Sequence, residues 1–239
     1  MKDQFIESVW NKAEEGNTDF IEHQFRGAYQ IYRFLLQVFG DEGLGAIAIR
    51  AGENQMTCEY DDELITTISL DCALLAKKVD VLFRIGLHRY DCLCKNNNYD
   101  RLEEIITIPC LWVNIKIQNP STIPGQLPSL ADAVEFLKSQ DIKPDIIVNA
   151  GTELQAYWIF EKPFIIDSAA ANDEITELSY DFQQKIIAAG LQRGWLIDDT
   201  SNIDRYQRLP GTWNWEHNPP TQINILEPEN NDWIFTGKH

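Results

Sequence analysis

Apolar residues recur at helical spacing in three parts of the chain. Over residues 19–39 they fall at every third or fourth position and Gly40 follows as a stop signal, which predicts a long amphipathic helix. The same period predicts a helix over 172–191. A shorter helix is expected over 70–78, with Ser69 as its N-cap. Each of these helices needs an apolar surface to pack against.

Alternating or continuously apolar runs predict strands between these helices. Two of the runs are joined by a four-residue turn around Gly151, which is typical of a hairpin. The expected strands cover 43–50, 64–69, 79–89, 110–118 and 221–227, and the expected hairpin covers 145–160. Because helices and strands alternate irregularly, we expect a mixed α+β fold.

A loop and a further helix precede the hairpin. Residues 118–129 hold three prolines and a glycine, so they are expected to form a loop. Ser129 and Asp132 are spaced as in a capping box, which predicts that a helix begins at this point and continues through Leu137.

Two polar residues interrupt the apolar strand over 110–118, which has the sequence CLWVNIKIQ. Side chains two positions apart on a strand point to the same face, so Asn114 and Lys116 are expected to lie side by side. An amide and an ammonium group side by side are unexpected on a strand that is otherwise apolar.

The charge of the chain limits the class of partner. It carries 37 acidic and 20 basic residues, a formal net charge of −17. Nucleic-acid-binding proteins usually present a basic face, so this balance argues against strong independent nucleic-acid binding and favours docking onto a basic protein. A local basic groove remains compatible with weak nucleic-acid binding.

Other compositional signals exclude several classes. The chain lacks the run of about 18 to 20 apolar residues that a membrane helix needs, and its first residues lack a secretory signal, so we expect a cytoplasmic protein. Five cysteines and four scattered histidines indicate neither a disulfide framework nor a metal centre. No cofactor is expected from these residues.

Three segments, in this order, resemble the archaeo-eukaryotic primase (AEP) superfamily, specifically its primase-polymerase and RepB-like plasmid-primase branches. The first is DVLFRIGLHR (80–89) followed by LWVNIKI (111–117), the second IIVNAGTELQAYWIFEKP (146–163), and the third DDTSNIDRYQRLPGTWNWE (198–216). The resemblance implies one primase-like catalytic core over 1–239, with an N-terminal αβ unit (1–78) and a motif-bearing half (79–239) that includes an RRM-like antiparallel sheet.

The resemblance implies that two catalytic positions have changed. In the family the strand carries Asp-x-Asp, which holds two divalent cations for nucleotidyl transfer. Asn114 and Lys116 fill these positions, and an ammonium group cannot ligate a cation. In the hairpin, the family's serine falls on Ala150, and its histidine, expected to contact the nucleotide triphosphate, falls on Gln155.

The third segment keeps its charged residues. The family's acid falls on Asp198 or Asp199, and the spacing does not choose between them. Arg205 and Arg208 match the family's two arginines, whose guanidinium forks suit phosphate oxygens. Alternatively, these arginines form salt bridges to neighbouring acids, such as Asp204.

Two smaller expectations follow from the same segments. Pro210 and Gly211 are expected to set a tight turn. We expect the Lys116 ammonium group to take the place of a cation and to pair with Asp198 or Asp199, because a carboxylate without a metal needs a positive partner. The alternative is that Lys116 extends into solvent at the strand end.

Three functions remain open at this point. The leading hypothesis is a primase-polymerase-like protein that has lost nucleotidyl transfer and acts by binding, as an accessory subunit in replication, mobile-element or CRISPR and other defence systems. The second is an active primase-polymerase that uses Mg²⁺ or Mn²⁺ and takes its acids from Asp91 or Asp100 together with Asp198 or Asp199. The third is an acidic subunit that docks on a protein and does not bind nucleic acid.

Overall fold

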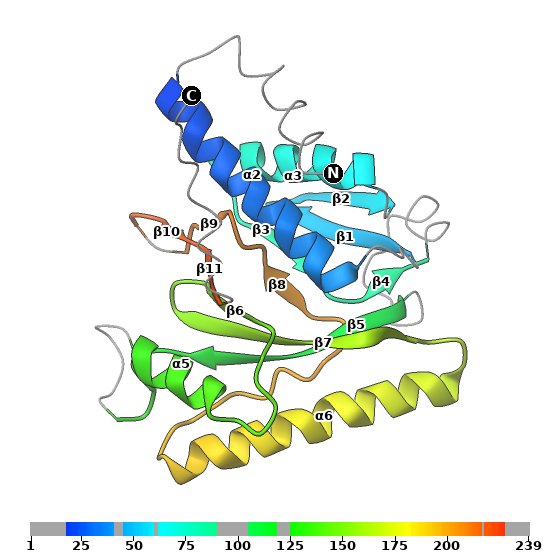
Figure 1. Ribbon diagram of the computed structural model, residues 1–239, viewed down its shortest axis with the longest axis vertical. Coiled ribbons are helices and arrows are strands. Elements are labelled where there is room, and N and C mark those ends of the chain that lie inside the picture. Colours follow the sequence, from blue (N-terminus) through cyan, green and yellow to red (C-terminus); the bar gives the residue numbers. More distant parts are fainter. Residues whose placement is uncertain are drawn as a thin grey trace.

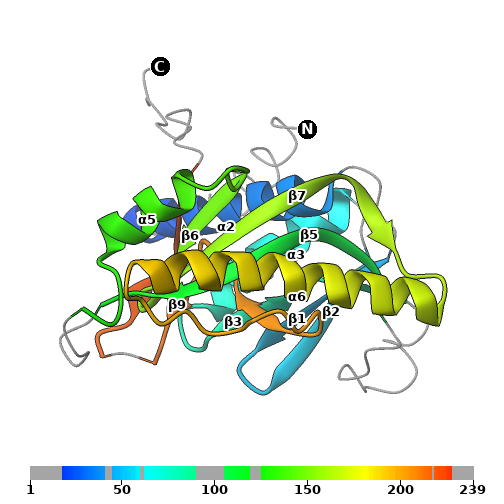
Figure 2. The same cartoon turned by 90° about the horizontal axis from the view of Figure 1, so that it is seen from below.

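The fold is built around one continuous antiparallel sheet (Figures 1 and 2). The computed structural model describes residues 18–40, 45–59, 62–89, 105–118, 125–216 and 218–227. Within these residues the sheet has nine strands in the order β11-β6-β7-β5-β4-β1-β3-β8, with β2 paired to β1. No described helix is both long enough and apolar enough to cross a bilayer.

The strands of this sheet come from both ends of the chain. β8, near the C-terminus, pairs with β3 and completes the side of the sheet that is built mainly by the N-terminal strands. The strands are β1 Ala46–Ala51, β2 Asn54–Glu59, β3 Val81–Arg84, β4 Leu87–His88, β5 Ile105–Lys116, β6 Ile146–Asn149, β7 Glu153–Ile165, β8 Tyr206–Arg208 and β11 Asn224–Glu227. A separate ribbon pairs β9 Trp213–Asn214 with β10 Thr221–Gln222.

The helices of the described residues cover the sheet in two groups. α2 (Thr18–Phe39) and α3 (Asp62–Leu75) pack together over the strands β1 to β3 (Figure 1). α6 (Ala169–Gln192) and α5 (Leu130–Lys138) lie beside β5 and β7 (Figure 2). Each group closes its own apolar cluster.

The strand β5 separates the two apolar clusters. Its odd-numbered residues Leu111, Val113 and Ile115 belong to the cluster that α5 and α6 close. Cys110 and Trp112, on the opposite face, belong to the cluster that α2 and α3 close. Asn114 and Lys116 continue the second face, so the polar residues of the strand lie between the two halves of the sheet.

The apolar patterns predicted the two long helices and the hairpin correctly. α2 and α6 match the helices expected over 19–39 and 172–191, and β6 and β7 form the expected hairpin, with Gly151 in its turn. The Ser129 hydroxyl accepts a hydrogen bond from the Asp132 backbone N–H at 3.1 Å, which confirms the expected cap of α5.

Three expectations about 64–89 were wrong. Residues 64–69 lie inside α3, because packing of Ile65 and Ile68 in the α2 cluster outweighs the strand preference of this segment. Ser69 therefore does not cap a helix; its hydroxyl donates to the Ile65 carbonyl oxygen at 2.7 Å. The strand expected over 79–89 is split into β3 and β4 at Gly86, where a Cβ would lie 2.6 Å from Ile105 Cγ2.

Candidate functional site

One edge of β5 is paired with a strand over the first part of β5 and is held by side chains over the second part. β4 pairs with β5 at Ile105 and Thr107. Further along, the Asn114 backbone N–H donates to Thr200 Oγ1 at 3.3 Å, and the Trp112 indole N–H donates to the Thr200 carbonyl oxygen at 2.9 Å. The segment 198–202 is thereby fixed along this edge.

A buried glutamine of α6 completes this attachment. Gln183 Nε2 donates to the Trp112 carbonyl oxygen at 2.9 Å, while its Oε1 accepts from the Thr200 N–H at 2.7 Å and from the Thr200 hydroxyl at 3.1 Å. Gln183 and Thr200 are buried. The Gln183 side chain therefore satisfies two backbone groups, the Trp112 carbonyl oxygen and the Thr200 N–H, that are not paired with a neighbouring strand.

This attachment places an acid beside Lys116. The Lys116 Nζ atom lies 2.6 Å from Asp198 Oδ2, and the two side chains are 60% and 58% exposed. Asp199 faces away: it accepts from the Ser201 N–H at 2.9 Å and from Gln184 Nε2 at 3.3 Å. The pairing expected of Lys116 is present, and Asp198 is its partner.

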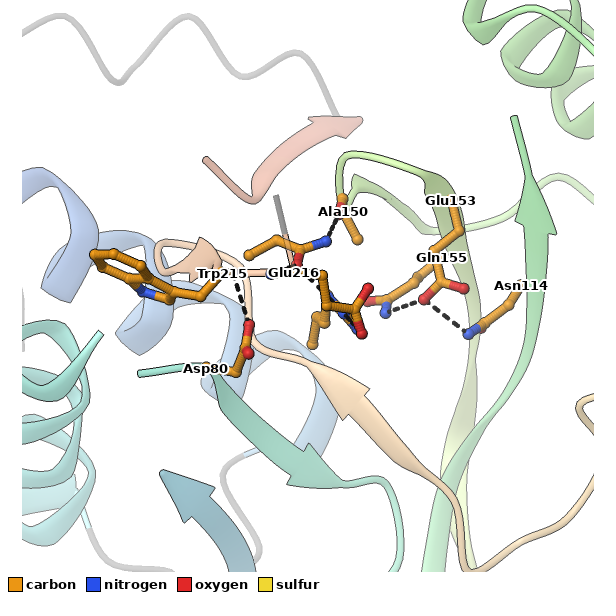
Figure 3. A network of polar contacts seen from close by, with 9 residues as sticks. Asp80, Asn114, Ala150, Glu153, Gln155, Trp215 and Glu216 are labelled. Atoms are coloured by element: carbon orange, nitrogen blue, oxygen red, sulfur yellow. Dashed lines mark hydrogen bonds and ion pairs between the residues drawn. The ribbon is translucent and has the colours of Figure 1, made fainter. Parts of the chain in front are cut away.

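Asn114, two residues before Lys116 on β5, belongs to a network of polar side chains (Figure 3). Its Nδ2 donates to Gln207 Oε1 at 2.9 Å and to Glu153 Oε1 at 3.3 Å. Gln155 Nε2 donates to the same Glu153 oxygen at 3.1 Å. Asn114, Gln155 and Gln207 are buried, so these amides are held in place.

A tyrosine closes the network on the core side. The Tyr157 hydroxyl donates to Gln155 Oε1 at 3.1 Å. Burial, followed by Cys110 and the Glu153 carboxylate, raises the pKa of Tyr157 well above its ordinary value. The hydroxyl therefore stays protonated and acts as a donor, and both ends of the Gln155 amide are engaged.

A second ion pair lies at the end of β8. Arg208 Nη2 is 2.6 Å from Glu216 Oε1 and donates to Asn214 Oδ1 at 3.3 Å. Asn214 is buried, and its Nδ2 donates to the Ala150 carbonyl oxygen at 2.9 Å. The RLPGTWN string thus connects the arginine to the turn of the hairpin.

The turn after Arg208 is fixed by close backbone packing. Gly211 has φ +89°, a backbone conformation that residues other than glycine rarely adopt. A Cβ at Gly27 of α2 would lie 2.7 Å from the Gly211 carbonyl oxygen. The tight turn expected at Pro210 and Gly211 is present, and two glycines let α2 approach it.

The other arginine of this segment is placed differently. Arg205 donates from its backbone N–H to the Asn202 carbonyl oxygen, and its Nε atom is buried without a hydrogen-bond partner among the described residues. Asp204, the acid suggested as a salt-bridge partner, lies 2.5 Å from Arg84. Arg208 has a carboxylate partner, but that partner is Glu216.

These residues surround a polar pocket of about 380 Å³. Three of its lining side chains are cationic and two are acidic. The lining residues are Lys116, Leu127, Thr152, Glu153, Arg205, Tyr206, Arg208 and Glu216.

The structure therefore separates the candidate residues into two groups. Lys116, Arg205 and Arg208 line the pocket, whereas Asn114, Ala150 and Gln155 are buried and do not line it. Asp91 and Asp100, proposed as relocated acids, lie outside the described residues.

Sequence reasoning missed four residues of the site. Glu153 lies directly opposite Lys116 in the β5–β7 register, and its position two residues before Gln155 could have indicated this. Gln183, Gln207 and Glu216 reach the site from α6, β8 and the turn after β9, and no periodic signal marks them.

Comparison with solved structures identifies the fold. No family model matches the sequence, and no curated protein does. The structure is similar to the AEP domain of the cyanophage S-2L primase-polymerase, with a TM-score of 0.51 and 16% identity over 82% of this chain and 88% of that chain. The chain has the mixed α+β fold of an AEP domain.

A second solved structure was also found. The catalytic domain of the primase RepB′, solved in complex with initiator DNA, matches this AEP-like chain with a TM-score of 0.48 and 14% identity, over 84% of this chain and 85% of that chain.

The side chains of this site do not suit the two divalent cations that the resemblance implies. The Lys116 ammonium group repels a cation and is already in contact with Asp198. Asn114 directs its amide nitrogen, rather than its oxygen, toward Glu153. No group of three or more His, Cys, Asp or Glu side chains that could hold a metal ion occurs in the described part of the chain.

Proposed function

We propose that this chain is a primase-polymerase-like protein that has lost nucleotidyl transfer and acts by binding. The Lys116–Asp198 ion pair, at 2.6 Å, is the observation that carries the proposal. By the resemblance it stands where a polymerase would hold a cation between carboxylates. The natural settings for such an accessory subunit are replication, mobile elements and CRISPR or other defence systems.

The chemistry of the pair supports the loss of activity. In nucleotidyl transfer one cation activates the attacking hydroxyl group and another accompanies the triphosphate. An ammonium group supplies charge but has no free coordination positions for either role. Asn114 is a poor replacement for the missing carboxylate, because its amide oxygen is neutral and its Nδ2 atom is held by Glu153 and Gln207.

The charges around the pocket support a binding role. Arg205 and Arg208 line it together with Lys116, so phosphate oxygens would find three cationic side chains there. The net charge of −17 limits binding to long nucleic acids, so we expect weak and salt-sensitive affinity. The acidic remainder of the surface suits a basic protein partner.

A primer-synthesis assay with Mg²⁺ and with Mn²⁺ tests the loss of activity. We expect no product from the wild-type chain, because the site lacks the acids that hold the cations. The D198A/D199A variant serves as control. Clear product from the wild type that disappears in this variant would overturn the proposal in favour of an active enzyme with relocated acids.

A restoration experiment gives an independent measurement. The N114D/K116D variant places two carboxylates on the same face of β5, and we expect it to bind Mn²⁺ measurably more tightly than the wild type, as followed by electron paramagnetic resonance. The control is K185D/Q192D, which makes the same change in net charge on the exposed face of α6 outside the pocket. Equal Mn²⁺ affinity in the wild type and N114D/K116D would contradict our assignment of these two positions.

The nature of the ligand is tested by binding at low salt. We expect the wild-type chain to bind a short single-stranded DNA weakly, and R205A/R208A to bind it several-fold less, in fluorescence anisotropy. The variant K143A/K185A removes two exposed positive charges outside the pocket and is the matched control. Undetectable binding by the wild type at low salt would favour the acidic docking subunit.

A further inference from the structure

We propose that Glu216 is an internal occupant of the arginine end of the pocket, so that a phosphate group binds there without a divalent cation and in competition with the Glu216 carboxylate. This inference rests on the proposed binding function and adds a form of regulation to it. The phosphate group can belong to a free polyphosphate or nucleotide, or to a nucleic-acid backbone.

The exposure of the two partners supports this exchange. The Arg208 side chain is 15% exposed, whereas the Glu216 side chain is 60% exposed. When the pair opens, the carboxylate regains most of its hydration while the guanidinium group stays in the pocket wall. The arginine end therefore stays in place and the carboxylate is the part that moves.

The backbone next to Glu216 is anchored, so only its side chain needs to rotate. The Glu216 N–H donates to Asn214 Oδ1 at 3.0 Å. The Trp215 N–H donates to Asp80 Oδ1 at 2.9 Å, and the Trp215 indole N–H donates to the Ala76 carbonyl oxygen at 2.8 Å. Figure 3 shows Trp215 and Asp80 holding this turn beside Glu216.

The pocket has a second guanidinium group for a larger anion. Arg205 lines it together with Arg208, and Glu216 is paired with Arg208 alone. A carboxylate has two oxygens, but a phosphate group presents three or more and bridges two guanidinium groups more readily. A phosphate group would thus use both arginines, whereas Glu216 pairs with Arg208.

A third cationic side chain in the same pocket explains why no metal is needed. Lys116 lines the pocket and pairs with Asp198. Its positive charge offsets part of the negative charge that a second phosphate group brings. The pocket therefore offers positive charge from side chains alone.

The experiment is calorimetric titration of the full chain in EDTA at low salt, with inorganic triphosphate in one arm and a 5′-hydroxyl single-stranded DNA in the other. We expect E216Q to bind one of these probes about three- to tenfold more tightly than the wild type, because a competing charge is removed. Tightening toward triphosphate identifies a free polyphosphate group, and tightening toward DNA identifies the backbone.

Two controls separate competition from a general change of charge. E161Q removes an exposed carboxylate elsewhere on β7, outside the pocket, and should leave the affinity unchanged. In the R208A background, E216Q should no longer tighten binding. R208M, which keeps the aliphatic part of the side chain but removes the charge, replaces R208A if that variant does not fold.

Several results would overturn the inference. These are an E216Q affinity equal to the wild type for both probes, an equal gain from E161Q, and a gain from E216Q that persists in R208A. None of them depends on primer synthesis. Failure of this inference is therefore distinguishable from failure of the proposed function, which the appearance of polymerase product would show.

Discussion

The two faces of the β5–β7 strand pair differ sharply in chemistry. Toward α5 and α6, the side chains of Val113, Ile115 and Leu154 are apolar and fully buried. On the other face, toward the site, Asn114 and Gln155 are equally buried but polar. At this end of the two strands, one side thus carries a core and the other a site.

This difference separates the residues that stabilise the fold from those that form the site. The apolar face contributes through buried area, at roughly 25 cal/mol per Å². The polar face contributes little net energy, because its hydrogen bonds replace bonds to water. It also leaves Asn114 Oδ1 and Gln207 Nε2 without a partner among the described residues. Changes on the polar face should therefore alter the site more than the fold.

The largest effect should come from the apolar face. Ile115 is fully buried against the α5 and α6 cluster, so I115A should lower the free energy of unfolding by about 2–5 kcal/mol through lost burial and a new cavity. Urea denaturation measures this loss. I142A removes the same atoms from a residue that is 70% exposed and should change stability by less than about 0.5 kcal/mol. Equal losses in both variants would contradict the assignment of stability to this face.

An intermediate effect is expected where β5 meets α6. Q183L keeps the volume of the side chain but leaves the Trp112 carbonyl oxygen and the Thr200 N–H without their partner. We expect a loss of about 1–3 kcal/mol and faster amide hydrogen exchange at Thr200. Q192L, at the exposed end of the same helix, is the matched control.

This experiment also tests whether the attachment positions Asp198. If Q183L weakens the attachment of segment 198–202, the Lys116–Asp198 pair should loosen while the α5 and α6 core remains. Unchanged exchange at Thr200 in Q183L would show that Gln183 is not needed to hold this segment.

The elements of the fold differ in how well the sequence predicts them. Helix α2 and the β6–β7 hairpin follow from periods of apolar residues that lie close together in the sequence. The segment 64–69 misled because its isoleucines and threonines favour a strand, and its contacts with α2 decide otherwise. β8 has three residues, too few for any period to be visible.

The site could be predicted only where its residues share a strand. Asn114 and Lys116 were found because a spacing of two places them on one face. The partners Gln183, Gln207 and Glu216 come from distant segments, and only the folded chain brings them together. Charge complementarity predicted that Lys116 pairs with an aspartate, but it could not decide between Asp198 and Asp199.

The smallest effect should come from the ion pair itself. Lys116 and Asp198 are both more than half exposed, so K116M should change the free energy of unfolding by less than about 1 kcal/mol, and this change should fall further at high salt. D198N should behave similarly, and a double-mutant cycle measures the coupling directly. A loss above about 2 kcal/mol in K116M would mean that the polar face supports the fold. A small loss, combined with a gain in Mn²⁺ affinity in K116M, would mean that this lysine serves the site, because removing it leaves Asp198 and Glu153 without the cation that lies beside them.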